Sequence, residues 1–320
     1  MGTSTPPRRV RAYLTGALEL VRESALFSDA VDWAAVRRDA EAVLSRARNY
    51  ADTHAFLAEV LSRAGGRHSR LTPPRGTRSG PGGGGGRTGR AGGEGVRGTG
   101  AAAQPMLPTG RVVRSVGYVR LPGLPGGRRL ARRYTATGGE LLDGLASARP
   151  VGWILDLRSN GGGNMWPMLA VVAPLLDEGP VGRFVRADGG SEVWALEHGR
   201  VLLDSTRMAR SLSSTGGPRD VPLAVLTSKG TASAGEAVAV ACRGEPVVRF
   251  LGTPTADFTT GNLTRVLRDG TRLHITSAHY ADRTGRLIVG PLAVDETVGD
   301  SDPRAAVRAA LTWIHRRCDG

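Results

Sequence analysis

The spacing of apolar residues near the start of the chain predicts helices. Val36 and Ala40, and later Phe56 and Val60, lie four positions apart within runs where apolar residues return every three or four positions. This period places the apolar side chains on one face of a helix, where they can pack against neighbouring helices. We therefore expect residues 1–71 to form an N-terminal helical bundle.

Further along the chain, short apolar runs alternate with segments of helical spacing. Val151–Leu157 and Val221–Thr227 are nearly continuous apolar runs, of the kind found in buried parallel strands. Each is followed by a segment with helical spacing, Met165–Leu176 and Ala234–Cys242. We also expect a strand at Val112–Leu121, a helix at Thr135–Ala148 and a hairpin around Asp269-Gly270. Strands followed by helices indicate an α/β core, which we expect to occupy residues 112–320.

The segment between these two regions, residues 72–111, has a different composition. It contains almost no large apolar side chain, and Gly82 to Gly86 are consecutive glycines. Because such a segment cannot bury enough surface to offset the entropy of ordering, we expect a disordered insertion. Its six arginines against the single Glu94 form a pattern that also occurs in RNA-binding segments. A flexible tether is the interpretation that we favour.

The charge and the cysteines limit the possible partners. The net charge is +14, and arginine carries nearly all of it because Lys229 is the only lysine. An arginine-rich, lysine-poor chain also results from a GC-rich genome, so we do not expect a nucleic acid partner. Cys242 and Cys318 form neither a disulfide framework nor a zinc site. No metal or organic cofactor is expected. No run of about 18 apolar residues occurs, so we expect a cytoplasmic protein that does not enter a membrane.

The strongest candidate for chemistry is Ser233. It lies between the apolar strand that ends at Thr227 and an alanine-rich helix, with a glycine-containing turn before it. A serine on such an elbow is exposed, and the amide of the next residue, Ala234, points to where a tetrahedral oxyanion would form. The alternative is that Ser233 only caps the helix, and the two roles are compatible.

A second motif follows the other buried strand. The run Asp156–Gly163 reads DLRSNGGG, and Thr231–Glu236 reads TASAGE. No Lys-Ser/Thr pair follows the glycines, so we set a phosphate-binding loop aside. Together the two segments resemble the D-L-R-x-N-G-G-G and T-A-S-A-x-E motifs of the tail-specific (carboxyl-terminal-processing) serine peptidases, over about Val112 to His315. The resemblance implies a ClpP/crotonase-like core, with Gly163, or failing that Gly162, as second oxyanion donor.

The chain departs from this family at the base. Where the better-known Ser/Lys members have a lysine, 25 residues after the nucleophile, this chain has Phe258. Lys229 lies on the turn before Ser233 and cannot easily reach back to its hydroxyl. The segment around His68 partly resembles that of Ser/His relatives such as nisin-resistance proteins and the tricorn core, although Gly66 replaces their aspartate. His68 is therefore the expected base, with activity rising through a pKa near 6 to 7.

The remaining histidines are weaker candidates, and no carboxylate can be assigned as a third member. Glu236 is only a possible support. The expected reaction is hydrolysis of peptides or protein C-terminal segments through an acyl-enzyme on Ser233. The alternative is a non-catalytic binding module that carries a hydrophobic or peptide ligand, because the same core fold resembles that of interphotoreceptor retinoid-binding proteins. The oligomeric state is left open.

Overall fold

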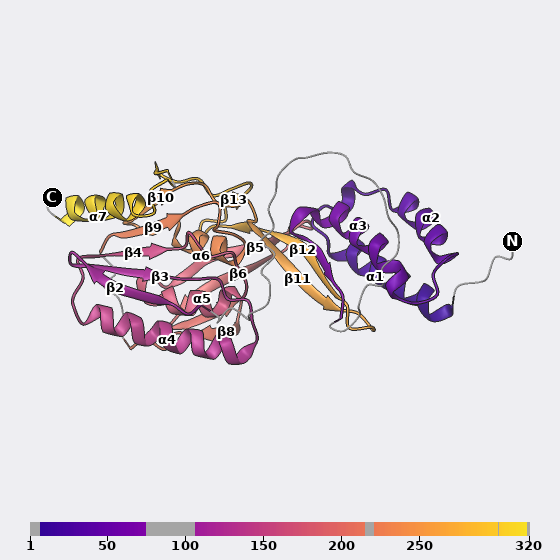
Figure 1. The fold of residues 1–320 in the computed structure, drawn as a ribbon, viewed down its shortest axis with the longest axis horizontal. Helices are drawn as coiled ribbons and strands as arrows, with labels where there is room; N and C mark the ends of the chain where they lie inside the picture. The colour runs from indigo at the N-terminus through magenta and orange to yellow at the C-terminus, as the bar shows by residue number, and fades with distance from the viewer. Residues whose placement is uncertain (1–6, 75–105, 215–220, 300, 319–320) are drawn as a thin grey trace.

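The computed structural model describes residues 7–74, 106–214, 221–299 and 301–318. Most of the segment expected to be a disordered insertion therefore lies outside the described residues. Within the described ranges, a helical part near the N-terminus and a larger α/β part are joined by a long β ribbon (Figure 1).

The N-terminal part is a bundle of three α-helices, as the apolar spacing predicted. They are α1 (Arg8–Ser24), α2 (Trp33–Leu44) and α3 (His54–Gly65). The Asp32 side chain caps α2 by accepting a 2.9 Å hydrogen bond from the Ala35 amide. The apolar faces of the helices share one core with Leu273 and Ile275, which come from a strand more than 200 positions later. The bundle is therefore packed onto the rest of the molecule and is not a separate unit.

The α/β part is built on a six-stranded sheet with the order β14-β10-β9-β4-β3-β2. All neighbours in it pair in parallel except β2 and β3. The strands are β2 (Thr109–Val113), β3 (Val116–Arg120), β4 (Gly152–Asp156), β9 (Leu223–Thr227), β10 (Val248–Gly252) and β14 (Glu296–Thr297). Both apolar runs expected to be buried parallel strands are confirmed, since β4 and β9 are buried along their whole length.

Helices cover both faces of this sheet. Successive side chains of a strand point to opposite faces, so the apolar residues of one strand are buried in two different cores. Trp153 and Leu155 of β4 pack in one core with α4 (Arg128–Ala146), α5 (Met165–Val172) and α6 (Ala234–Cys242). Ile154 lies in a second core, against α7 (Ala305–Cys318). The expectation of an α/β core behind an N-terminal helical bundle is thus confirmed.

A second, antiparallel sheet contains the ribbon that reaches the bundle. Its order is β1-β12-β5-β6-β7-β8, with β11 and β13 also paired to β12. The strands are β1 (Arg70–Thr72), β5 (Gly179–Arg186), β6 (Ser191–Glu197), β7 (Arg200–Leu203), β8 (Thr206–Arg210), β11 (Thr260–Val266), β12 (Arg272–Ala281) and β13 (Leu287–Ile288). The hairpin expected at Asp269-Gly270 joins β11 to β12. No local pattern in the sequence predicts β5–β8.

Two elements differ from the sequence-based expectation. The single strand expected from Val112 is a hairpin, β2–β3, that turns at Arg114 and Ser115 with φ of 48° and 63°. Neither residue is a glycine, so the usual signal of such a turn is missing. Helix α4 begins at Arg128, well before the expected Thr135. Its start was not visible in the sequence because four arginines in its first turns interrupt the apolar spacing.

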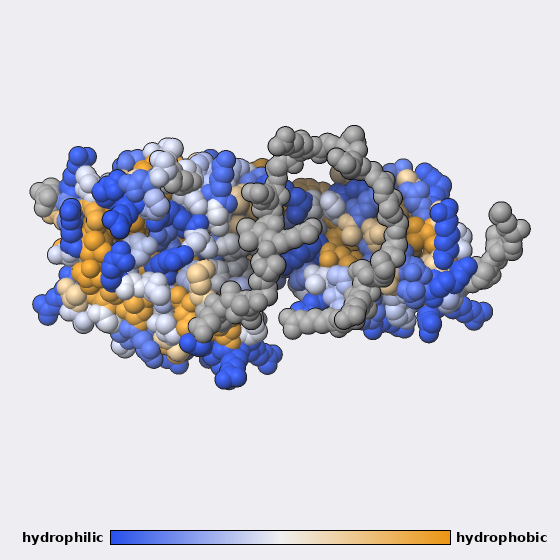
Figure 2. Space-filling model, viewed as in Figure 1, coloured by the Kyte–Doolittle hydropathy of each residue, from blue (hydrophilic) through white to orange (hydrophobic). Residues whose placement is uncertain are grey.

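Apolar surface gathers at the end of the α/β part that is farthest from the bundle, between α7 and α4 (Figure 2). The exposed Val112 and Val151 belong to this end, next to the amino ends of β3 and β4. The carboxyl ends of the parallel strands lie at the opposite edge, toward the ribbon, where ligands bind in most open α/β sheets. None of the described helices is long and apolar enough to span a membrane.

Candidate active site

Ser233 occupies a strained turn between β9 and α6. Its backbone has φ of 53° and ψ of −115°, which L-residues rarely adopt and which is held here by neighbouring contacts. The Thr231 hydroxyl donates to the Leu157 carbonyl at 2.9 Å, and the Ala232 amide donates to the Asn160 carbonyl at 2.9 Å. These bonds tie the serine turn to the glycine turn that follows β4. The structure therefore brings the two motifs together at one edge of the sheet.

Asn160 organises the glycine turn. It is fully buried; its Nδ2 donates to the Leu121 carbonyl at 3.0 Å, and its Oδ1 accepts from the Gly162 amide at 3.1 Å. Gly162 has φ of +101°, and a Cβ there would lie 2.9 Å from the Ser233 Cβ. Glycine is required at this position both by the backbone conformation and by the close approach of the serine turn.

The same contacts distinguish the two candidate oxyanion donors of the glycine turn. The Gly162 amide is already engaged by Asn160. The amides of Gly163 and Ala234 have no hydrogen-bond acceptor among the residues that the structure describes. Ala234 begins α6, and its nitrogen would lie 3.2 Å from a Cβ on Gly162, so the two turns are in direct contact. Gly163 and Ala234 are the pair with free N–H groups at this site.

The charged residues of the first motif are structural. Asp156 is buried, accepts from the Tyr118 hydroxyl at 2.6 Å and pairs with Arg158 at 2.7 Å. Burial alone would raise the pKa of Asp156, but the hydrogen bonds from Arg158 and Tyr118 outweigh it and the pKa is lowered. Arg158 also donates to the Pro303 carbonyl at 2.7 Å. This pair fixes the end of β4 from which the glycine turn starts.

Glu236 holds the serine turn against the loop before β11. Its Oε2 accepts from the amides of Ser233 at 2.8 Å and Phe258 at 2.9 Å. Its Oε1 accepts from the Thr255 hydroxyl at 2.5 Å and the Asp257 amide at 3.1 Å. Burial raises the pKa of Glu236, and the four donated hydrogen bonds oppose the rise. The carboxylate therefore positions backbone on both sides of the site.

His68 lies in a single 3₁₀ turn, Gly66–His68, between α3 and β1. Its Nδ1 lies 2.7 Å from the Thr260 Oγ1, and its ring packs edge-on against Phe258 with 5.0 Å between centroids. Burial and then the charges of Arg70 and Arg67 lower the pKa of His68 to about 4. This value is below the 6 to 7 expected from the sequence, because the surroundings are half-buried and cationic.

Ser233 and His68 are linked through two intermediate residues, Glu236 and Phe258. Glu236 bonds the amides of both Ser233 and Phe258, and the Phe258 ring packs on His68. No hydrogen bond joins Ser233 directly to His68 in the described part of the chain. The aromatic residue at the family's lysine position thus contacts the imidazole.

Sequence reasoning missed two residues of this site. Thr260 pairs with His68, as given above, and the side chain of Ser233 is one of the influences on the pKa of the buried Tyr280 hydroxyl. Burial, more than any other influence, raises the pKa of Tyr280, so its hydroxyl stays protonated. Both residues belong to strands of the ribbon, and no local motif marks them. Only their pairing in space reveals them.

The other candidate bases have contacts elsewhere. Lys229 is exposed and points to no partner among the described residues. The other five histidines contact, in chain order, Asp269 (His54), Glu178 (His198), Thr264 (His274), Phe27 (His279) and the Arg114 carbonyl (His315). Of the histidines, His68 is the one whose ring packs on Phe258, and Glu236 bonds the amides of both Phe258 and Ser233.

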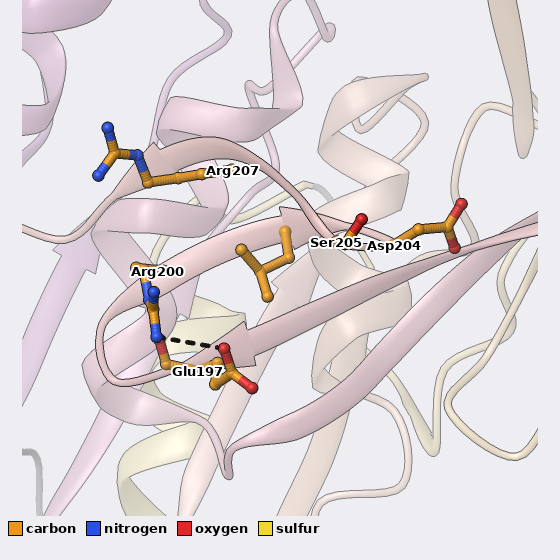
Figure 3. Close-up of a pocket in the computed structure, with 6 residues that line it drawn as sticks. Glu197, Arg200, Asp204, Ser205 and Arg207 are labelled. Carbon is orange, nitrogen blue, oxygen red and sulfur yellow. Dashed lines mark hydrogen bonds and ion pairs between the residues drawn. The ribbon is translucent and has the colours of Figure 1, made fainter.

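The described ranges show no metal site, and a surface depression lies apart from Ser233. No three His, Cys, Asp or Glu side chains gather there as a metal site would require. A surface depression on β6–β8 contains a Glu197–Arg200 pair at 3.3 Å, while the Arg207 side chain extends away from it (Figure 3). Its lining residues are Glu197, Arg200, Leu202, Asp204, Ser205 and Arg207. It contains no residue of the Ser233 site.

Known proteins resemble the chain over most of its length. It is 28% identical over 309 residues to the nisin-resistance protein of Lactococcus lactis subsp. lactis, covering 96% of this chain and 88% of that one. A probable CtpA-like serine protease of Staphylococcus aureus (strain N315) is 29% identical over 181 residues. That match covers 56% of this chain but only 34% of the relative, so the chain spans about a third of that protein.

Solved structures share the fold. The structure of a lipoprotein from Streptococcus agalactiae superposes with a TM-score of 0.76 at 22% identity, covering 99% of this chain and 100% of that one. The photosystem II D1 C-terminal processing protease gives a TM-score of 0.64 at 18% identity, covering 94% and 97%.

The sequence profile of one family covers more than half of the chain. It matches residues 115–298, which include β3, both motifs and the Phe258–Tyr280 region. The resemblance inferred from the two motifs is thereby confirmed. The chain belongs to peptidase family S41.

Proposed function

We propose that this protein is a serine peptidase in which Ser233 is the nucleophile and His68 the general base. The observation that carries the proposal is the strained serine turn packed on the glycine turn, with the free amides of Ala234 and Gly163 beside it. Donors held in place before the reaction stabilise the charge that develops on a tetrahedral intermediate. A helix cap alone would not need this pair of open amides.

The environment of His68 supports its role as base. Because Nδ1 is engaged by Thr260, Nε2 is the nitrogen left to accept a proton. With a pKa of about 4 the imidazole is neutral at pH 7, so its lone pair is available. Ser233 and His68 are not bonded in this structure, so the reaction requires a movement of the Ser233 side chain or of the 3₁₀ turn that brings the two groups within hydrogen-bond reach.

The reaction then proceeds in two halves. The Ser233 oxygen attacks the peptide carbonyl carbon while His68 takes its proton, and the carbonyl oxygen becomes an anion between the amides of Ala234 and Gly163. His68 gives the proton to the leaving amine as the peptide C–N bond breaks. Water, deprotonated by His68, then attacks the acyl carbonyl, and His68 returns the proton to the Ser233 oxygen as the acyl C–O bond breaks. The substrates are peptides or the C-terminal segments of proteins, a class suggested by the protease names of the relatives.

Labelling of Ser233 with a fluorophosphonate tests the proposal. The intact mass of the protein should increase by one adduct, and peptide mapping should find it on Ser233. Ser233→Ala should abolish labelling while its melting temperature stays nearly unchanged, because the amide that bonds Glu236 is retained. His68→Ala should slow labelling about 100-fold or more, and Lys229→Ala should change it far less.

The second candidate function is a non-catalytic module that binds a hydrophobic or peptide ligand. Two observations favour it, the lack of a Ser233–His68 hydrogen bond and the Phe258 in place of the family's lysine. A wild-type protein that binds peptides but resists the fluorophosphonate at every pH would support this module and contradict the peptidase proposal.

A further inference from the structure

The ribbon beside His68 has one face that belongs to no core. In β12, Arg272 and His274 are two positions apart and so point to the same face. His274 lies between Arg70 of β1 and Thr264 of β11, and Arg272 lies between Thr72 and Val266. These six residues share one face, and all are exposed except the half-buried His274. The alternate row is different, because its Leu273 is fully buried in the bundle core.

This face, which we call the cationic strip, is defined by Arg70, Arg272 and His274. Neither arginine has an ion pair or a hydrogen bond from its side chain among the described residues. Two acidic residues of the neighbouring loops are already engaged, since Asp257 pairs with Arg67 and Asp269 with His54. No carboxylate of the described residues therefore pairs with Arg70 or Arg272.

The strip continues directly from the candidate base. His68 precedes Arg70 by two positions, and the charge of Arg70 is one of the influences that lower the pKa of His68. Alternate side chains along an extended strand are about 7 Å apart. A peptide that passes His68 in an extended conformation along β1 would place a side chain over Arg70.

We propose that the cationic strip binds acidic side chains of the substrate and makes this protein selective for acidic peptide segments. This inference rests on the proposed peptidase function and adds its substrate class. Arginine suits the role because its planar guanidinium pairs with a carboxylate through two hydrogen bonds. Arg70 and Arg272 are diagonal neighbours on the same face of β1 and β12. Without a counter-ion, the repulsion between their charges disfavours the folded ribbon, and an acidic ligand would offset this repulsion.

An acidic peptide fits the strip better than a nucleic acid does. Proteins that bind single-stranded nucleic acids combine basic groups with aromatic side chains on which the bases stack. The six residues of this face include no Phe, Tyr or Trp. The period of two along the ribbon instead matches alternate side chains of an extended peptide.

Binding to the inactive Ser233→Ala protein tests the inference apart from catalysis. The probes are a fluorescein-labelled octapeptide pool with Glu at alternate positions and the same pool with Gln, followed by fluorescence anisotropy. At about 50 mM salt the Glu pool should bind about tenfold more tightly than the Gln pool, and the preference should shrink at about 500 mM salt. Arg70→Glu together with Arg272→Glu should abolish or invert it.

Arg265→Glu is the matched control. Arg265 is also an exposed, unpaired arginine of the described ribbon, but it lies in the row of Leu273 on the opposite face. It should change the Glu preference less than about twofold. Equal binding of the two pools, or an equal loss in the Arg265→Glu variant, would overturn the inference. So would tight binding of an RNA octamer that depends on Arg70 and Arg272 without a Glu preference.

Failure of the substrate inference and failure of the peptidase proposal have different signatures. A protein labelled on Ser233 by the fluorophosphonate but without a Glu preference is a peptidase of other selectivity. A protein with the Glu preference that is never labelled is an acidic-peptide binder without catalysis, and the proposed reaction is then wrong.

Discussion

The Nδ1 atom of His68 lies 2.7 Å from the hydroxyl oxygen of Thr260, so the candidate base is oriented by a hydroxyl group and not by a carboxylate. In the usual serine-histidine arrangement an acidic side chain stabilises the imidazolium that forms during the reaction. Thr260 can fix the tautomer and the ring orientation, but it carries no charge. The remaining surroundings of His68 are cationic, with Arg70 and Arg67 both lowering its pKa.

Removing this hydroxyl should slow the reaction without unfolding the protein. Thr260→Val keeps the side-chain shape but leaves the imidazole free to rotate or change tautomer, and we expect fluorophosphonate labelling to slow about tenfold or more. Thr260→Ser should restore most of the rate. Thr264→Val is the control. Thr264 lies on the same strand as Thr260, and its hydroxyl contacts His274 of β12 at 3.0 Å. Wild-type labelling rates in Thr260→Val would exclude a positioning role.

The pH dependence of labelling should reflect the low pKa of His68. A base must be neutral, so the rate should rise with pH through about 4 and be constant near neutrality. Arg70→Gln removes a positive charge near the imidazole and should move this rise to higher pH. Labelling rates measured between pH 3.5 and 8, in steps of about half a pH unit, would give both profiles. A rise centred near pH 6.5 in the wild type would contradict the half-buried, cationic environment.

The same shift predicts how His68 affects stability. Its pKa of about 4 in the folded protein is below the value of about 6.5 for an unfolded histidine. The unfolded chain therefore binds a proton first as the pH falls, and His68 lowers the free energy of unfolding progressively between about pH 6.5 and 4. In urea unfolding, the difference in stability between the wild type and His68→Gln should be constant above this window and should shift against the wild type as the pH falls through it.

Glu236→Gln should destabilise the serine turn. The carboxylate accepts four hydrogen bonds, and an amide nitrogen in place of one oxygen would face two N–H or O–H donors. We expect a loss of about 1–3 kcal/mol in the free energy of unfolding, measured with urea. Glu41→Gln is the control, because Glu41 pairs with Arg11 at the exposed surface, where such pairs contribute less than about 1 kcal/mol. Similar losses in both variants would contradict the role given to Glu236.

A cluster around Asp269 should couple the bundle to the ribbon. Asp269, at the β11–β12 turn, contacts His54 of α3 at 2.9 Å and accepts from Tyr13 of α1 at 3.1 Å. Because α3 leads into His68, we expect loosening of this contact to reduce both stability and labelling. A double-mutant cycle of His54→Ala and Asp269→Ala should give a coupling of about 0.5–3 kcal/mol in urea unfolding. Additive losses would mean that the two side chains do not interact.

The two motifs and the buried strands could be found from the sequence because their signals are local. A continuous apolar run, such as the one around Ile154, has to be buried on both faces, and β4 lies inside the sheet. The serine turn and the glycine turn each follow such a strand, and the carboxyl ends of parallel strands meet at one edge. The sequence therefore predicts that Ser233 and Gly162 lie near each other.

Where the local sequence signals are weaker, fewer features of the structure can be predicted. The strands β5–β8 were missed, and β5 contains Gly179, Pro180 and Gly182, which are unfavourable in strand interiors. The sequence also left both Gly162 and Gly163 open as oxyanion donors. Only the hydrogen bond from the Gly162 amide to Asn160 distinguishes them.

The chain by itself thus determined the family, the α/β core and the nucleophile candidate, since each depends on residues close together in the sequence. The tertiary structure decided what surrounds His68. Thr260 and Phe258 lie about 190 positions after His68, and the bundle core is completed by Leu273 of β12. Local patterns carry no information about which distant segments pair, because pairing depends on how whole faces are buried together. Burial and charge near the imidazole, and hence its low pKa, follow from that packing alone.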